Sequence, residues 1–235
     1  MPADRTVVHR FLPPVLSLNA GFVDTAGFLM LQGLFTAHVT GNFVTLGAAL
    51  VHGSSGILAK MLALPVFCAV VVATRLADHR LTSRGLPVLK LALFLKLMLL
   101  IVGAVLAIRF APFQAKDGGL ALITGMVLVS AMAIQNAAHR VHFASAPPTT
   151  LMTGTTTQIM IDLADLIQGV PAEARALAKS RLGRMSISVG SFAVGCGAAA
   201  ILYSRYGSWC FVVPPMVAAY ALALQQVPRP TRAQP

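Results

Sequence analysis

Six long runs of apolar residues, separated by short polar stretches, dominate the pattern of this chain. Each run is close to the roughly 20 residues that an α-helix needs to cross the hydrocarbon core of a bilayer. Glycine and proline pairs such as Gly118–Gly119 and Pro147–Pro148 separate the runs. The pattern predicts an all-α, polytopic membrane helix bundle. The predicted spans lie at about 15–34, 57–74, 88–108, 118–138, 185–204 and 209–227.

Two further segments, at about 39–51 and 150–168, are shorter and more polar than the six runs. The second is rich in threonine and carries Asp162 and Asp165, so it is too polar to face lipid along its whole length. Each short segment either crosses the bilayer or enters it and returns on the same side. The distribution of positive charge distinguishes these alternatives, because loops rich in Lys and Arg stay in the cytoplasm.

If both short segments cross, eleven Lys and Arg residues lie inside and six outside. If both turn back, thirteen of the eighteen lie inside, four lie outside (Lys60, Arg109, Lys116 and Arg205), and Lys96 is within a helix. The second arrangement fits the positive-inside rule better. We therefore expect about six spans plus two short re-entrant or broken helices. The predicted cytoplasmic parts are both termini, 75–90, 139–149 and the connection 169–184.

With three crossings in each half, the single membrane domain 1–235 divides into half-repeats at about 15–108 and 118–227. An odd number of crossings gives two similar halves opposite orientations, which is the inverted repeat of many transporters. The short segments open with similar residues, Thr40-Gly41-Asn42 and Thr153-Gly154-Thr155. Asp24 precedes Gly41 by 17 residues, and Asn136 precedes Gly154 by 18. We expect both short segments to begin near the middle of the bilayer.

Composition agrees with a membrane protein and excludes other classes. The chain is 57% hydrophobic and 11% charged, against roughly 45–50% and 25% in soluble domains. Its net charge of +11 does not predict nucleic-acid binding, because no basic stripe carries interleaved aromatics. The first run is too long for a cleaved signal peptide and contains Asp24, so we interpret it as a retained helix. Cys68, Cys196 and Cys210 lie in apolar runs and are expected to be buried hydrophobes.

Two pairs of motifs resemble the YoaK family of bacterial membrane proteins, a domain of unknown function. The first pair is GFVDTAGF at 21–28 and FTAHVTGN at 35–42; the second is QNA at 135–137 and PTTLMTGT at 148–155. Thr155-Thr156-Thr157 is more polar than the family's usual pattern after the second Thr-Gly. The resemblance implies a multi-pass protein of the bacterial cytoplasmic (inner) membrane, with no substrate specified.

Acidic side chains at membrane depth are the first candidates for function, because burying them in lipid is costly. Asp24 lies in the middle of the first run, and we expect a protein partner for it, with Lys96 as one candidate. Threonines and glycines at helix starts can cap free N–H groups or let a ligand approach, and histidine can relay protons. The candidate substrate-binding residues are Asp24, His38, Thr40, Gly41, Asn42, Gln135, Asn136, Thr153, Gly154, Thr155 and Asp162.

Three functions remain open at this point. The leading hypothesis is a transporter or channel that passes a small polar or anionic solute through a site between the halves. The rival is a membrane-embedded enzyme acting on a lipid or amphiphile, with Asp24 or His38 as acid or base. The third is a non-catalytic membrane scaffold. Membrane lipids are the expected partners, homo-oligomerisation is left open, and no motif predicts a metal, a cofactor or a nucleophile.

Overall fold

The structure, a computed structural model, describes residues 10–52, 56–113 and 118–225. Within these ranges the chain forms α-helices and one 3₁₀ helix and contains no β-strand, which confirms the predicted all-α membrane bundle. Both chain ends, predicted to be cytoplasmic, lie outside the described residues. The helices are α1 (Leu12–Met30), α2 (Gly41–His52), α3 (Ile57–Thr82), α4 (Val88–Phe110), α5 (Gly119–His142), α6 (Met152–Gln168), α7 (Ala172–Tyr206), η1 (Gly207–Val212) and α8 (Val213–Leu224).

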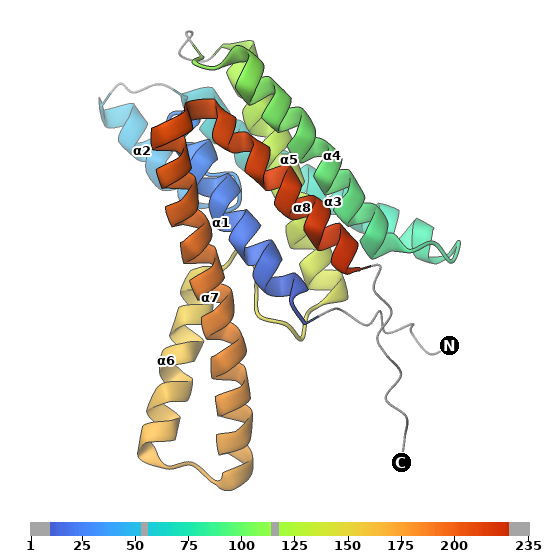
Figure 1. Ribbon diagram of the computed structural model, residues 1–235, viewed down its shortest axis with the longest axis vertical. Coiled ribbons are helices and arrows are strands. Elements are labelled where there is room, and N and C mark those ends of the chain that lie inside the picture. Colours follow the sequence, from blue (N-terminus) through green and yellow to red (C-terminus); the bar gives the residue numbers. More distant parts are fainter. Residues whose placement is uncertain (1–9, 53–55, 114–117, 226–235) are drawn as a thin grey trace.

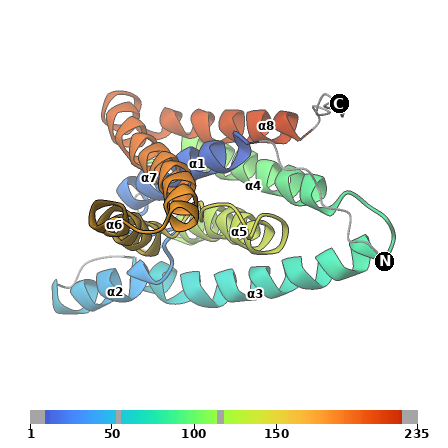
Figure 2. The same cartoon turned by 90° about the horizontal axis from the view of Figure 1, so that it is seen from below.

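Helix α1 lies inside the bundle, in contact with α7, α8 and α5 (Figures 1 and 2). Its side chains are correspondingly buried along most of its length. Helix α5 packs against α3 and α4, and α4 also packs against α8. Among the described helices, α2 packs only on α3 and α6 only on α7. The hairpin of α6 and the first half of α7 projects from one end of the molecule (Figure 1).

Two helix breaks produce the short helices α2 and α6. Helix α1 ends at Met30, four residues before the predicted end of the first span, because Gln32 (φ 58°) and Gly33 (φ 84°) adopt left-handed backbone conformations that end a helix. Loop 143–151, which contains Pro147 and Pro148, separates α5 from α6. With 12 and 17 residues, α2 and α6 are about 18 Å and 25 Å long at 1.5 Å per residue. Both are shorter than the roughly 30 Å hydrocarbon core of a bilayer.

Four of the described helical segments are long and apolar enough to cross a membrane: Ile57–Thr82, Val88–Phe110, Gly119–His142 and Ala172–Leu224. This number differs from the six predicted spans for two reasons. The polar residues Ser17, Asn19 and Asp24 interrupt the apolar character of α1. The last segment is 53 residues long and joins α7, η1 and α8; Pro214 and Pro215 in the first turn of α8 suit the start of a helix.

Most of the predicted connection 169–184 is helical. Only residues 169–171 lie between α6 and α7, and residues from Ala172 onward form the first turns of the 35-residue α7. The cause is local, because Ala172–Arg184 is rich in Ala, Leu, Arg and Lys, which are strong helix formers, and contains no proline. The charged helical segment is therefore continuous with the span at 185–204.

Glycines allow α1 and α7 to cross with their backbones almost in contact. A Cβ atom added at Gly195 would lie 2.1 Å from the carbonyl oxygen of Leu18, and one at Gly21 would lie 2.2 Å from the carbonyl oxygen of Phe192. Side chains at these positions would push the helices apart. The same helix pair is joined by a hydrogen bond of 2.8 Å between the hydroxyls of Ser17 and Ser188. This crossing positions α7 beside the break that follows α1.

Candidate functional site at the two helix breaks

Asp24 organises the first break by accepting hydrogen bonds from the loop that follows α1. Its Oδ1 accepts from the backbone N–H groups of Thr36 and Ala37, both at 2.7 Å, and from the Thr36 hydroxyl at 3.3 Å. The Asp24 residue is only 4% exposed. The carboxylate therefore holds loop 31–40 back along α1, about two turns before the end of that helix.

His38 completes this group. Its Nδ1 lies 2.8 Å from Oδ2 of Asp24, and its ring meets the ring of Phe192 on α7 edge-on, with 5.3 Å between centroids. The side chain of His38 is 31% exposed, whereas that of Asp24 is 5% exposed. The pair therefore joins a buried carboxylate to an imidazole that reaches the surface of the chain. An Asp–His pair of this kind can bind a polar solute or hold and pass a proton.

Asn42 and Gly41 shape the start of α2. The Asn42 side chain accepts from the backbone N–H of Phe35 and donates to its carbonyl, both at 2.8 Å. The Phe35 ring lies 3.0 Å from the position of a Cβ added at Gly41, so glycine makes room for this ring. Thr40 is exposed beside them. The predicted Thr-Gly-Asn element is thus brought together with Asp24, and the Gly41 space is filled by Phe35.

Gln135 and Asn136 form the corresponding hydrogen bonds to the loop at the second break. Gln135 Nε2 donates to the Thr149 hydroxyl at 3.0 Å and to the carbonyl of Leu16 at 3.1 Å. Asn136 Oδ1 accepts from the Thr150 hydroxyl at 2.6 Å. Loop 143–151 therefore turns back along α5, as loop 31–40 turns back along α1.

Comparison with known proteins gives the family. The sequence profile of a family described as "Protein of unknown function (DUF1275)" matches residues 12–224. The chain belongs to this family. The UPF0700 transmembrane protein YoaK of Bacillus subtilis (strain 168) is 30% identical over 155 residues, which cover 63% of this chain and 64% of YoaK, less than two thirds of its length. No solved structure matches the chain. The resemblance to the YoaK family is confirmed, and the chain is an integral membrane protein.

Lys96 is not the partner of Asp24 in this DUF1275 member. The lysine is fully buried in α4, and its Nζ donates to Oε1 of Gln135 at 2.5 Å. Lys96 was one candidate partner of Asp24, and the structure pairs it with Gln135 instead. The reason is the fold: α4 packs against α5, which carries Gln135, and α4 makes no helix contact with α1 in the described chain.

The threonine element at the second break also differs from expectation. Helix α6 begins at Met152, its N-cap is Leu151, and no side chain caps it. Thr155 instead donates to the carbonyl of Leu151 at 2.8 Å. Thr153 and Gly154 are exposed, and nothing lies within 4 Å of a Cβ added at Gly154. The capping role expected for Thr153 is therefore wrong, and the structure brings neither Thr153 nor Gly154 into the hydrogen bonds of the break.

Asp162 lies away from both breaks, in an ion pair between α6 and α7. Its carboxylate is fully buried and accepts from the guanidinium of Arg181, with 2.7 Å between Nε and Oδ2, and from Gln158 at 2.9 Å. The Asp–Arg pair joins the two arms of the projecting hairpin. The sequence did not identify Arg181 as a partner, although it lies in the charged helical segment that follows Asp162.

A third buried acid, Asp78, was not predicted from the sequence. Asp78 is 7% exposed and pairs with Arg75, one turn earlier on α3, at 2.7 Å. Its other oxygen lies 2.8 Å from Nε2 of His142 at the end of α5. Asp78 falls outside the predicted span 57–74, but α3 continues to Thr82 and packs against α5. The i, i+3 spacing of Arg75 and Asp78 on one helix was the available signal.

Proposed function

We propose that this protein is a transporter or channel for a small polar or anionic solute, with its site between two inverted half-repeats at the helix breaks. The half-repeats are about 15–108 and 118–227. The observation that carries this proposal is the matching pair of breaks, each held by polar side chains of the preceding helix. Non-helical backbone at membrane depth is tolerated only where protein or a water-filled cavity surrounds it, and transporters use such broken helices at their sites.

The spacing of the hydrogen bonds supports the repeat. In the first half, Asp24 bonds to His38, 14 residues later. In the second half, Gln135 bonds to Thr149 and Asn136 to Thr150, each also 14 residues later. The same separation at both breaks is expected if the two halves share one folding plan.

The packing of the helices supports it as well. Helix α1 packs on α7, as α5 packs on α3. The short helix of each half packs on the next helix: α2 on α3, and α6 on α7. The last helix of each half packs on the first helix of the other half: α4 on α5, and α8 on α1. The two last helices, α4 and α8, also pack on each other. When η1 is counted as the start of α8, exchanging α1–α4 with α5–α8 leaves the set of contacts unchanged. A pseudo-two-fold axis relating inverted repeats produces this reciprocity.

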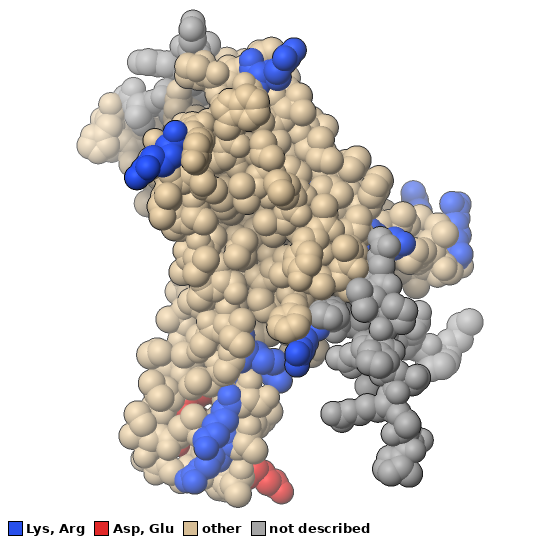
Figure 3. All heavy atoms as spheres, in the orientation of Figure 1, with Lys and Arg blue, Asp and Glu red and all other residues tan. Residues whose placement is uncertain are grey.

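The distribution of charge supports an orientation in the cytoplasmic membrane. On the face in Figure 3, basic side chains lie at the top and upper left, at the right edge and in the lower part, around a central region without charged side chains. Arg109 and Arg205, in the last turns of α4 and α7, belong to one end of the bundle. The end of α3, the start of α4 and the end of α5 lie together at the other, more basic end (Figure 1), which we place in the cytoplasm.

Cysteine labelling tests this orientation in intact cells. With Cys68, Cys196 and Cys210 replaced by serine, Arg84→Cys and Lys179→Cys should react only with a reagent on the cytoplasmic side. Arg205→Cys should react from outside. Reaction of Arg84→Cys and Lys179→Cys from opposite sides would contradict both the six-span arrangement and the inverted repeat.

The transport proposal is tested by solute flux into proteoliposomes. The probes are potassium acetate, succinate and phosphate, with glycerol as a neutral solute, followed by light scattering. We expect saturable flux of at least one probe above empty liposomes, and a loss of most of it in Asp24→Asn and His38→Gln. Asp165→Asn, an exposed acid on α6, is the control that should retain the flux. Equal flux in the wild type and in empty liposomes for all four probes would overturn the proposal.

One observation favours the enzyme as a second candidate. The contact of 2.8 Å between Asp24 and His38 has the geometry of a carboxylate that orients a histidine acting as general base. Incubating the purified protein with membrane lipid extract and analysing the products by mass spectrometry tests this candidate. Products that disappear in His38→Gln but persist in Asp165→Asn would favour the enzyme over the transporter, and unchanged lipids would count against it.

A further inference from the structure

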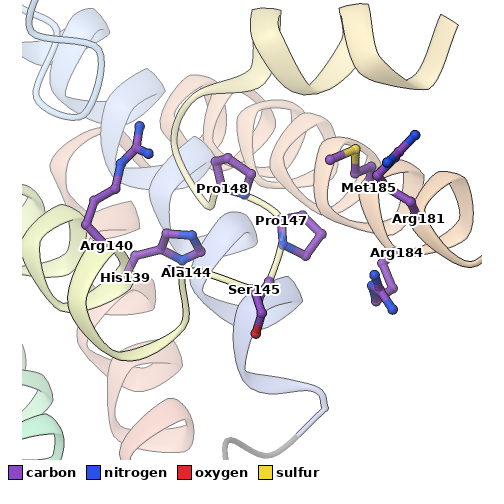
Figure 4. A pocket seen from close by; sticks show the side chains of 10 residues that line it. His139, Arg140, Ala144, Ser145, Pro147, Pro148, Arg181, Arg184 and Met185 are labelled. Carbon is purple, nitrogen blue, oxygen red and sulfur yellow. The ribbon is translucent and has the colours of Figure 1, made fainter. Parts of the chain in front are cut away.

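A cavity of about 280 Å³ lies at the basic end of the bundle, apart from the Asp24–His38 pair. Three parts of the chain line it: the last turn of α5, the loop at 144–148, and the middle of α7 (Figure 4). Its volume is at the lower end of the range for small-molecule sites, which suits a compact ligand or a headgroup. The lining residues are His139, Arg140, Ala144, Ser145, Ala146, Pro147, Pro148, Arg181, Arg184 and Met185.

The charges of the lining are all positive. Arg140, Arg181 and Arg184 contribute guanidinium groups, and the lining contains no acidic residue. Arg181 is neutralised by Asp162 through their ion pair. Arg140 and Arg184 are exposed and form no ion pair among the described residues. The cavity therefore presents two uncompensated positive charges, beside the guanidinium of Arg181.

A buried imidazole nitrogen adds a polar group that lacks a partner. His139 is 6% exposed, and its Nδ1 makes no hydrogen bond within the described chain. The ring is held edge-on against Phe143, with 5.4 Å between centroids. Because this nitrogen is itself buried, it is not offered to a ligand in the cavity, and His139 contributes to the wall. In Figure 4 the ring is turned toward the loop at Pro147 and Pro148.

Hydrogen bonds fix part of the wall of the cavity to the neighbouring helices. The Ser188 hydroxyl of α7 donates to the carbonyl of Pro148 at 3.0 Å and also bonds to Ser17 on α1. Ser145 and Arg184 extend in the same direction from opposite sides of the cavity in Figure 4. Arg184 lies on a long, continuous helix. A hydroxyl and a guanidinium on fixed elements suit the oxygens of a phosphate group.

We propose that this cavity is a binding site for a phosphate group, bound by Arg184 and Ser145, with the positive charge of Arg140 as a further attraction. The phosphate belongs either to the headgroup of an anionic lipid or to a free phosphate compound, and both sources share the same chemistry. The cavity is lined by part of loop 143–151, the loop of the second break, so it adjoins the proposed solute site. Its test uses binding alone.

Two binding measurements on the full-length purified protein distinguish the two sources. Calorimetric titration with inorganic phosphate, in detergent without added lipid, tests a free phosphate compound. Native mass spectrometry with added phosphatidylglycerol, compared with phosphatidylcholine of the same chain length, tests an anionic headgroup. We expect saturable binding of inorganic phosphate, or a preference of about tenfold for phosphatidylglycerol, which corresponds to about 1.4 kcal/mol.

Arg184→Gln is the main test variant, because this side chain is exposed and lies within α7, so the change should leave the fold intact. It should weaken binding of the effective probe about tenfold or more, as expected for the loss of a charged hydrogen-bond partner. Ser145→Ala keeps every charge and should weaken binding by a smaller factor. Arg175→Gln is the matched control: it removes the same charge from the same helix outside the cavity, and binding should stay within about twofold.

The outcomes are decisive in both directions. Loss of binding in Arg184→Gln and retention in Arg175→Gln support the site, for whichever probe binds. Absence of saturable binding by both probes would overturn the proposal. Equal losses in Arg184→Gln and Arg175→Gln would also overturn it, because they would mean that the general positive charge of this end attracts anions. Binding to the cavity in a protein without solute flux would overturn the transporter alone.

Discussion

Replacing Asp24 by asparagine or by alanine separates the charge of this side chain from its role as a hydrogen-bond acceptor. Asparagine nearly preserves the shape and keeps one oxygen for the backbone N–H groups of Thr36 and Ala37. Its amide nitrogen would take the place of Oδ2, which lies 2.8 Å from Nδ1 of His38. From there it can donate to the Nδ1 of a neutral His38. Alanine removes every acceptor and leaves both backbone N–H groups buried.

The size of each effect follows from the three short bonds of the carboxylate. A hydrogen bond to a charged group contributes about 1 kcal/mol more than a neutral one, so Asp24→Asn loses roughly 3 kcal/mol in bonds. Burying a neutral amide in place of a carboxylate is less costly, which leaves a net loss of about 1–2 kcal/mol. Two unsatisfied N–H groups cost about 1–3 kcal/mol each, so Asp24→Ala should lose about 4 kcal/mol or more once the cavity is included.

The assay is equilibrium unfolding of the purified variants in mixed micelles, with the free energy of unfolding compared between them. Asp165→Asn is the control, since this acid is exposed on α6, and it should change stability by less than about 0.5 kcal/mol. Equal losses in Asp24→Asn and Asp24→Ala would refute the reasoning. They would mean that the side-chain oxygen of asparagine contributes nothing as an acceptor for the backbone N–H groups. A loss below about 0.5 kcal/mol in both variants would show that Asp24 does not hold the loop.

Two further predictions concern packing and the second break. Gly195→Ala should lower the free energy of unfolding by about 1–3 kcal/mol or more, because its Cβ would meet the Leu18 carbonyl. Gly197→Ala, with nothing within 4 Å, should have no such cost in the same unfolding assay, and equal effects would contradict the crossing. Gln135→Leu should cost about 1–3 kcal/mol by leaving the buried amino group of Lys96 without its acceptor. The double variant with Lys96→Met should recover much of this loss in a double-mutant cycle, and no recovery would contradict the pairing.

Features that follow from the cost of burying polar groups in a bilayer could be predicted from the sequence. The apolar runs predicted the spanning helices, because a bilayer requires about 20 apolar residues in succession. Asp24 was correctly expected to need protein partners, since its side chain is too short to reach water from the middle of the helix. The polar residues after each break marked α2 and α6 as unlike the spans around them.

The partners of these residues could not be derived in the same way. Asp24 bonds mainly to backbone groups 12 and 13 residues later. Almost every residue type carries a backbone N–H, so the sequence does not show which of them is the partner. Lys96 was expected near Asp24 because both are charged, but the choice of Gln135 depends on which helices pack together. The end of α1 was placed too late because the run stays apolar through Leu34, and the break depends on the backbone at Gln32 and Gly33.

The two breaks share a spacing but differ in charge, and the number of backbone donors explains why. Loop 31–40 contains no proline, so every residue in it carries a backbone N–H donor that needs an acceptor. A carboxylate, with two oxygens and several lone pairs, satisfies more donors than an amide, and Asp24 accepts from two backbone groups and from His38. The second loop contains Pro147 and Pro148, which carry no N–H. Fewer backbone donors remain there, and the neutral amides of Gln135 and Asn136 bond instead to the hydroxyls of Thr149 and Thr150. The charge at residue 24 therefore has a structural cause that holds whether or not a solute binds beside it.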